Sequence, residues 1–198
     1  NERRDHLFLL VRREPQLHVD AAEKRAEVLG LQRLQHGQHL KHKAIAEQKM
    51  AEIYPAIAIC RMPLMFGAPS PMSLGFLKGM ISNLQAGKEI NLFTDEFRTP
   101  TSATAASQGL LLAVAKQVQG ILHLGGKERI SRYDFGLLLA DILQLPQDLI
   151  KPGKQADVVM VASRSPDTSL DSSKAFALGY QPLSLREELT NLCNILTI

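Results

Sequence analysis

Short apolar runs that alternate with helix-length stretches constrain the fold of this chain more than any other feature. Ala56–Cys60, Ile90–Phe93 and Gly120–Leu124 are runs of four or five mostly apolar residues, which are typical of buried strands. Val158–Ala162 predicts a further strand. We predict helices over residues 44–53, 73–86, 103–117, 133–143, 172–178 and 185–196. Strands that alternate with helices of about 10–15 residues favour an α/β layered domain, and the long loops favour a substrate-binding lobe.

The composition changes near residue 40. Five of the six histidines fall in the first 42 residues, whereas all three tyrosines lie after residue 53. Two interpretations of residues 1–40 remain open: a solvated tail with a marginal helix near Ala21–Leu34, or a stretch read out of its natural frame. In either case we predict an atypical, poorly ordered segment over residues 1–40 and an orderly domain over residues 41–198.

Composition excludes several classes of function. The chain has 198 residues, of which 45% are hydrophobic, so it can bury a core, and its net charge of +3 with no stripe of basic and aromatic residues argues against nucleic-acid binding. No apolar run approaches the roughly 20 residues of a membrane helix, and no metal-ligand spacing is present. Cys60 and Cys193 lie in apolar surroundings and predict buried thiols in a reducing, cytoplasmic compartment.

Seven short motifs follow one another in an order that resembles a known family. They are Lys43–Gln48 (KAIAEQ), Ile59–Gly67 (ICRMPLMFG), Phe76–Phe93, Phe97–Thr101 (FRTPT), Gly120–Gly126 (GILHLGG), Ser131–Phe135 (SRYDF), and Arg164–Pro166 followed by Leu170–Lys174 (LDSSK). Each motif is weak alone, but the order resembles the C-terminal part of the extended short-chain dehydrogenases/reductases, in the dTDP-4-dehydrorhamnose reductase-like subgroup, over roughly residues 41–196.

The resemblance implies a fold and a role for each segment of the chain. We expect an α/β fold with part of a Rossmann-like sheet and the small substrate-binding lobe of this superfamily. Residues 41–198 would form the substrate side of a sugar-nucleotide reductase-like domain, and residues 1–40 would be foreign to the family.

The catalytic pair of the family is incomplete here. The family uses a Tyr-x-x-x-Lys pair, in which the Tyr donates a proton and the Lys lowers its pKa and holds the nicotinamide ribose. Lys43 occupies the Lys position, as a catalytic and cofactor-binding candidate, but His39 stands at the Tyr position. The loop Met62, Pro63 and Leu64 resembles the family's nicotinamide contact, although these are also ordinary turn residues.

The parent family binds NADP or NAD, and this chain lacks the glycine-rich turn that would bind the pyrophosphate of the dinucleotide. A Gly-x-Gly-x-x-Gly turn between a strand and a helix lets the backbone approach the pyrophosphate. Gly125 and Gly126 are followed by Lys127 and Glu128 and not by a helix start. We therefore expect the chain not to bind the dinucleotide tightly.

The substrate side matches the family better. The resemblance implies a nucleotide-diphosphate sugar, whose phosphates call for arginine. Arg98 and Arg164 are the candidates for the phosphates, and Phe97 and Tyr133 are further substrate-binding candidates. Alternatively, the two arginines form ordinary surface ion pairs, and Tyr133 packs in the core.

Three functions remain open. The first is a fragment of an NAD(P)H-dependent 4-keto-sugar reductase, inactive alone because catalysis needs both substrates oriented together. The second is a non-catalytic binding module, like the regulatory beta subunit of methionine adenosyltransferase, a relative that works with a partner enzyme. The third is an epimerase or dehydratase. We also expect self-association, because strands 56–60 and 120–124 would lose their neighbours.

Overall fold

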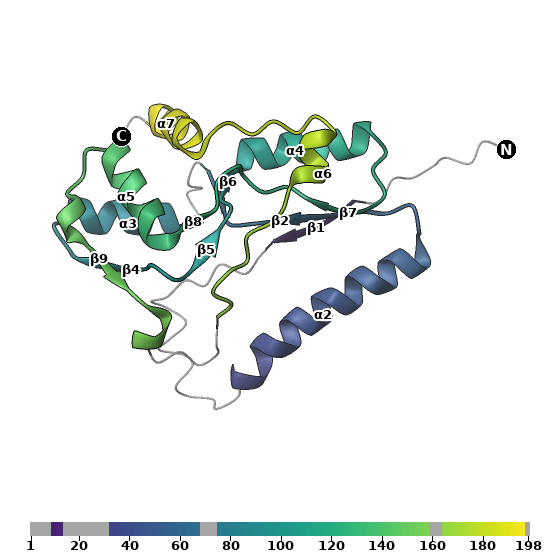
Figure 1. Cartoon of the computed structure of the whole chain (residues 1–198), viewed down its shortest axis with the longest axis horizontal. Helices are drawn as coiled ribbons and strands as arrows, with labels where there is room; N and C mark the ends of the chain where they lie inside the picture. The colour runs from purple at the N-terminus through teal and green to yellow at the C-terminus, as the bar shows by residue number, and fades with distance from the viewer. Residues whose placement is uncertain (1–8, 14–31, 68–74, 159–163, 197–198) are drawn as a thin grey trace.

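The computed structural model describes residues 9–13, 32–67, 75–158 and 164–196. Its elements form a parallel sheet flanked by helices and a smaller lobe of helices around a second strand pair (Figure 1). Two pairs of two-residue strands connect these parts.

The larger sheet has three parallel strands in the order β1-β2-β7. They are β1 (Leu9–Arg13), β2 (Ala58–Met62) and β7 (Gly120–His123). The central strand β2 has four buried residues among its five, as its near-continuous apolar run requires when both faces are covered. Helices α4 (Ala103–Ala115) and α6 (Ser173–Ala177) lie on one side of the sheet, and α2 (Gln32–Ile53) lies on the other (Figure 1).

The smaller lobe is built on β4 (Ile90–Phe93) and β9 (Ile150–Gly153), which pair in parallel. Three helices surround this pair: α3 (Phe76–Gln85), α5 (Arg132–Ile142) and α7 (Leu185–Leu196). Phe135 is 1% exposed and lies in the core of this lobe with Leu139 and Leu189. Short 3-10 helices over Gln147–Leu149 and Gln155–Asp157 precede and follow β9.

Two short strand pairs lie between the larger sheet and the smaller lobe. In these pairs, β3 (Met65–Phe66) runs parallel to β6 (Thr101–Ser102), and β5 (Phe97–Arg98) runs antiparallel to β8 (Ile130–Ser131). β6 leads directly into α4, which lies on the larger sheet, and β8 leads directly into α5 of the smaller lobe, so the short strand pairs link the two parts (Figure 1).

Most predicted elements are confirmed, with small shifts of their ends. The strand over 90–93 and the helix over 185–196 have the predicted bounds, and β2 is shifted two residues toward the C-terminus. The expectation that strands 56–60 and 120–124 lose neighbours is wrong for β2, which pairs with β1 on one side and β7 on the other, whereas among the described residues β7 pairs with β2 alone. Residues 14–31 and 159–163, which carry most of the predicted helix 21–34 and strand 158–162, lie outside the described residues.

The four two-residue strands were not predicted, and neither were two longer strands, β1 and β9. The apolar part of β1 is only three residues long, because the last two residues of the strand are Arg12 and Arg13. In β9, Lys151 and the exposed Pro152 interrupt the apolar pattern, and proline is tolerated in a strand only at an edge. The predicted boundary at residue 40 falls inside α2, which runs continuously across it.

Candidate anion-binding site

The carboxylate of Glu96 is buried, and Glu96 lies in the chain between β4 of the smaller lobe and β5. Glu96 is 6% exposed and precedes β5. Its Oε1 lies 3.1 Å from Nη2 of Arg98, and its Oε2 lies 3.4 Å from Nη1 of Arg164. Its main-chain carbonyl accepts a hydrogen bond of 3.0 Å from the amide of Arg132. One glutamate therefore contacts three arginine residues from three segments of the chain.

Each arginine is held by a further contact. Nη1 of Arg98 donates a hydrogen bond of 2.6 Å to the carbonyl oxygen of Phe97. The guanidinium of Arg132 lies 4.7 Å from the ring centroid of Phe76, and that of Arg164 lies 6.0 Å from the ring centroid of Phe93. Cations over aromatic faces are attracted by the ring quadrupole, so these rings orient the two guanidinium groups.

The cluster of Arg98, Arg132 and Arg164 carries more positive charge than Glu96 neutralises. Burial lowers the pKa of Arg132, the charge of Glu96 raises it, and the charges of Arg98 and Arg164 lower it further. A guanidinium nevertheless stays protonated in proteins. Three positive charges thus face one negative charge, which leaves an excess of two positive charges in a partly buried site.

The arginines keep unused donors. A guanidinium has five N–H donors in a planar fork, and Glu96 and Phe97 accept from only part of those on Arg98. Arginine forks match the oxygens of phosphate groups and form strong, charge-assisted hydrogen bonds with them. We refer to Arg98, Arg132, Arg164 and Glu96 together as the arginine cluster, and its chemistry suits an anion with two negative charges.

Phe97 ties the cluster to the segment that carries Arg164. Its amide donates a hydrogen bond of 2.7 Å to the carbonyl of Pro166, and its carbonyl accepts one of 3.2 Å from the amide of Thr168. The guanidinium of Arg129 lies 3.7 Å from the centroid of the Phe97 ring and is also paired with Asp167 at 2.8 Å. One face of the Phe97 ring is therefore already covered by a cation.

The structure brings together Arg98, Arg164 and Phe97, three of the four residues that the sequence suggested for the substrate. The fourth, Tyr133, is partly buried and packs against Leu84, Ala140 and Ile150 of the smaller lobe. Its ring thus contributes to the core of that lobe.

Two members of the cluster, Glu96 and Arg132, were missed from the sequence, although both carry a signal. Glu96 and Arg98 are two residues apart in an extended segment, which places their side chains on one face. Arg132 occupies the first turn of α5, where the partial positive charge of the helix N-terminus disfavours a cation. The N-cap Ser131, whose side chain accepts from the amide of Asp134, starts the helix at this point as predicted.

The candidates for the nicotinamide side lie elsewhere. Lys43 is in α2, and α2 contributes no residue to the arginine cluster. Met62, Pro63 and Leu64 follow one another at the end of β2 and are buried, with Met62 in the core of the larger sheet. Next to them, Arg61 reaches across to the buried Glu47 of α2, with 2.7 Å between Nη2 and Oε2.

The glycines Gly125 and Gly126 do not fit a pyrophosphate. A Cβ at Gly125 would lie 2.7 Å from Oγ1 of Thr99, and a Cβ at Gly126 would overlap the carbonyl oxygen of Pro100. These glycines are required for contact between two chain segments, which leaves no open backbone surface. Among the described residues, no glycine-rich turn between a strand and a helix provides a site for the dinucleotide pyrophosphate.

Comparison with known proteins supports a single family. The family model described as "RmlD substrate binding domain" matches residues 37–198. The probable low-salt glycan biosynthesis reductase Agl14 of Haloferax volcanii is 27% identical over 155 residues, which cover 77% of this chain and 52% of that protein. Methionine adenosyltransferase 2 subunit beta of Danio rerio is 26% identical over 145 residues, 70% of this chain and 45% of that protein.

Solved structures show the same fold. A dTDP-4-dehydrorhamnose reductase of Clostridium acetobutylicum superposes with a TM-score of 0.71 at 21% identity, over 80% of this chain and 55% of that one. The dTDP-4-dehydrorhamnose reductase of Bacillus anthracis, solved in complex with NADP, gives 0.63 at 17% identity, over 70% and 48%. The predicted fold class is confirmed. The chain spans about half the length of the curated relatives it matches.

Proposed function

The chain belongs to the RmlD substrate-binding domain family, and from this premise we propose that it forms the sugar-nucleotide side of an NAD(P)H-dependent keto-sugar reductase. Residues 41–198 would carry this role, with residues 1–40 atypical of the family. The proposal includes Arg98 and Arg164 as ligands of the diphosphate.

The arginine cluster is the observation that carries the proposal. The diphosphate of a nucleotide sugar carries two negative charges, which equals the excess charge of the cluster. Glu96 holds the arginines in place in the absence of ligand, so less side-chain freedom is lost when the anion binds. Phe97 and the arginines come from segments that hydrogen bonds already join.

We propose that the chain alone binds the sugar nucleotide without reducing it. The bound cofactor of the family supplies a hydride, and a proton donor must stand beside the keto group. Lys43, Met62, Pro63 and Leu64 remain candidates for contact with the nicotinamide. We propose that this chain does not bind the dinucleotide tightly, as the sequence suggests through its lack of a Gly-x-Gly-x-x-Gly motif.

Calorimetric titration with dTDP-glucose tests the proposal. We expect micromolar binding of dTDP-glucose and none of thymidine, which lacks the phosphates. Arg98→Gln and Arg164→Gln should each weaken binding about 10-fold or more, because a hydrogen bond to a charged group contributes about 1.5–3 kcal/mol. Titration with NADPH in the same series measures the weak cofactor binding.

A matched control separates the cluster from general charge effects. Arg186 forms a surface pair with Asp141, in which both side chains are more than half exposed, so Arg186→Gln should leave the affinity unchanged. Equal binding of thymidine and dTDP-glucose, or equal loss in all three variants, would contradict the proposal.

A second candidate function is a regulatory binding module. The similarity to the beta subunit of methionine adenosyltransferase 2 and the presence of His39 in place of the tyrosine favour it. Sedimentation of the chain with a methionine adenosyltransferase catalytic subunit tests this role. A stable complex together with no binding of dTDP-glucose would make it the leading function.

We propose a cytoplasmic location for the protein, on the basis of its cysteines. Both cysteines, Cys60 and Cys193, are free and buried, which supports a reducing compartment. Among the residues described, the helices include none that is both long and apolar enough to cross a membrane.

A further inference from the structure

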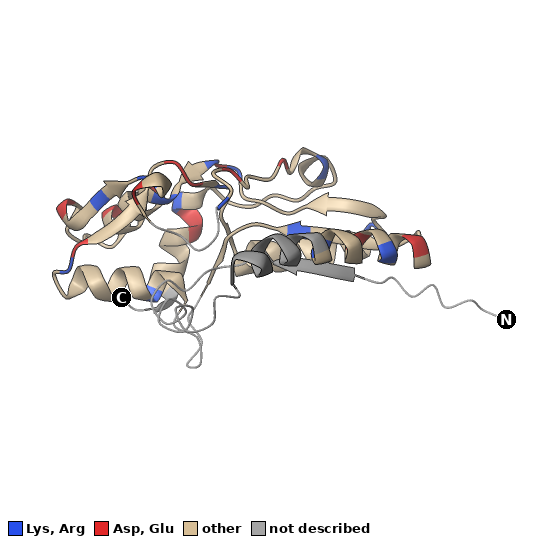
Figure 2. Cartoon of the chain, turned by 90° about the horizontal axis from the view of Figure 1, so that it is seen from below, with Lys and Arg blue, Asp and Glu red and all other residues tan. Residues whose placement is uncertain are grey.

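Charge alone does not distinguish the arginine cluster from the rest of the molecule. Basic and acidic residues are interspersed over the smaller lobe and the strands that lead to it (Figure 2). The cluster differs because Arg98 and Arg164, on segments far apart in the sequence, meet at the single carboxylate of Glu96. Two arginines bind one ligand well only when the segments that carry them are held at a fixed spacing. The contacts that join these segments therefore affect the site.

Thr99, the residue after β5, joins the three segments that supply the arginines. Its side chain is buried, with the residue 5% exposed. Its Oγ1 accepts a hydrogen bond of 3.1 Å from the amide of Leu170, on the segment that carries Arg164. Its carbonyl oxygen accepts one of 3.1 Å from the amide of Gly126, in the loop that leads to β8 and Arg132. One threonine thus connects all three segments.

The junction around Thr99 is tightly packed. Oγ of Ser172, which is 3% exposed, accepts a hydrogen bond of 2.8 Å from the amide of Gly125. A Cβ at Gly125 would lie 2.7 Å from Oγ1 of Thr99 and 3.1 Å from Oγ of Ser172. Close-packed interiors have low compressibility and transmit strain. A change at Thr99 should therefore shift the neighbouring segments.

The segment that begins at Arg164 runs alongside β5 as far as this junction. The amide of Phe97 donates a hydrogen bond of 2.7 Å to Pro166, and its carbonyl accepts one of 3.2 Å from Thr168. The hydrogen bond to Thr99 is the next contact along the same pair of segments. The ion pair of Arg164 in the cluster is the longer of the two, at 3.4 Å. Its position therefore depends strongly on these contacts of the segment.

We propose that Thr99 is a positioning residue of the anion site, which fixes the distance between Arg98 and Arg164 by holding Leu170. We assign its hydroxyl no contact with the ligand, because it acts through Arg164. The inference rests on the proposed function, since it concerns the binding of the same diphosphate.

A double-mutant cycle measured by calorimetry with dTDP-glucose tests the proposal. Thr99→Val keeps the shape of the side chain and removes the hydroxyl that holds Leu170. It should weaken binding about fivefold or more in the unmodified chain, but less than about twofold in the Arg164→Gln variant, because coupled residues are not additive. An equal loss in both backgrounds, or no loss in either, would overturn the proposal.

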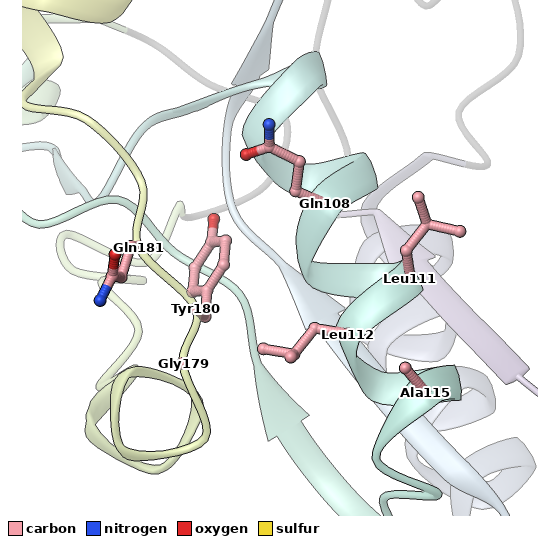
Figure 3. A pocket seen from close by; sticks show the side chains of 7 residues that line it. All are labelled: Gln108, Leu111, Leu112, Ala115, Gly179, Tyr180 and Gln181. Carbon is pink, nitrogen blue, oxygen red and sulfur yellow. The ribbon is translucent and has the colours of Figure 1, made fainter.

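Thr101→Val is the matched control. Thr101 is fully buried, and its Oγ1 lies 3.2 Å from the hydroxyl of Tyr180. Tyr180 faces Leu112 of α4 across a groove that contains no member of the arginine cluster (Figure 3). The control should lose stability in urea, as Thr99→Val does, because each loses a buried hydrogen bond. It should keep its affinity for dTDP-glucose within about twofold. Equal losses of affinity in the two variants would show a general effect of stability and refute the positioning role.

Urea unfolding without ligand separates this proposal from the proposed function. If Thr99 holds the segment of Arg164, then Arg164→Gln should cost less stability in the Thr99→Val variant than in the unmodified chain, because the contact with Glu96 is already weakened. Additive losses would contradict the positioning of Arg164 by Thr99. A failure of the unmodified chain to bind dTDP-glucose would overturn the proposed function, and the unfolding cycle would still decide whether Thr99 positions Arg164.

Discussion

Replacing Glu96 with glutamine keeps the shape of the side chain and removes its charge. In the folded protein this leaves Arg98, Arg132 and Arg164 facing one another without a compensating carboxylate. At an effective dielectric constant of about 20, unit charges 3–4 Å apart interact by about 4–5 kcal/mol, before the opposing cost of desolvation. Without the attraction to Glu96, the positive charges of the three arginines would repel one another in a site that is only partly exposed to water.

The expected loss of stability follows from the burial of the cluster. Removing one partner of a buried ion pair destabilises a protein by about 3–5 kcal/mol. The side chains of Arg98 and Arg164 are 13% and 22% exposed, and solvent screening moves the expected value to the lower end, about 3 kcal/mol. For a chain of this size that corresponds to a decrease of about 6–12 °C in Tm.

Urea and thermal unfolding followed by circular dichroism measure this change. Glu89→Gln is the matched control, because Glu89 pairs with Lys151 at 3.3 Å but its side chain is 63% exposed. Exposed pairs contribute about 0–1 kcal/mol, so the control should unfold close to the unmodified chain. Equal stability of the two variants would refute this account of the cluster.

Three further changes test other parts of the structure. Gly126→Ala should destabilise the fold by about 3 kcal/mol or more, measured by urea unfolding, because the new methyl group would overlap the carbonyl oxygen of Pro100. Burial raises the pKa of Cys60 to about 11, so a thiol reagent at pH 8 should modify it only after urea unfolds the chain. Hydrogen bonds from Ser169 above all lower the pKa of Asp167 to about 2. Its contribution to stability is therefore present above its unfolded pKa of 3.8 and is lost as the pH falls toward 2. The difference in unfolding midpoint between the unmodified chain and Asp167→Asn should shrink over that range.

Each of these changes has a control or a contrary outcome. Gly79→Ala, in α3, places a methyl group in open space and should be neutral or stabilising, whereas an equal loss in both glycine variants would contradict the packing argument. Rapid labelling of Cys60 in the native chain would contradict its burial. A constant effect of Asp167→Asn between pH 7 and about 3 would show that the charge of Asp167 contributes nothing.

The outline of the fold could be predicted because its core strands are continuous apolar runs. The run at 56–60 predicted β2, and the run at 120–124 predicted β7, within two residues at each end. β1 and β9 could not be predicted in this way, because charged residues or a proline fill part of each strand. Their pairing depends on neighbours that are distant in the sequence, and such tertiary contacts override local propensity.

The candidate site was predicted only in part. The family resemblance identified Arg98 and Arg164, but a resemblance transfers only residues that match a motif. Glu96 and Arg132 belong to the site because strand pairing between β5 and β8 places the start of α5 beside the end of β4. The sequence also suggested Tyr133, which is adjacent to Arg132. Successive side chains of a helix point in different directions, and the ring of Tyr133 points into the core of the smaller lobe.

A crystal structure of the chain with a bound dTDP-sugar is the most direct test of the central claim. The account predicts diphosphate oxygens within hydrogen-bond distance of Arg98, Arg132 and Arg164, with Glu96 still paired to at least one of them. A sugar nucleotide bound elsewhere, with the arginines still held by Glu96 alone, would contradict it.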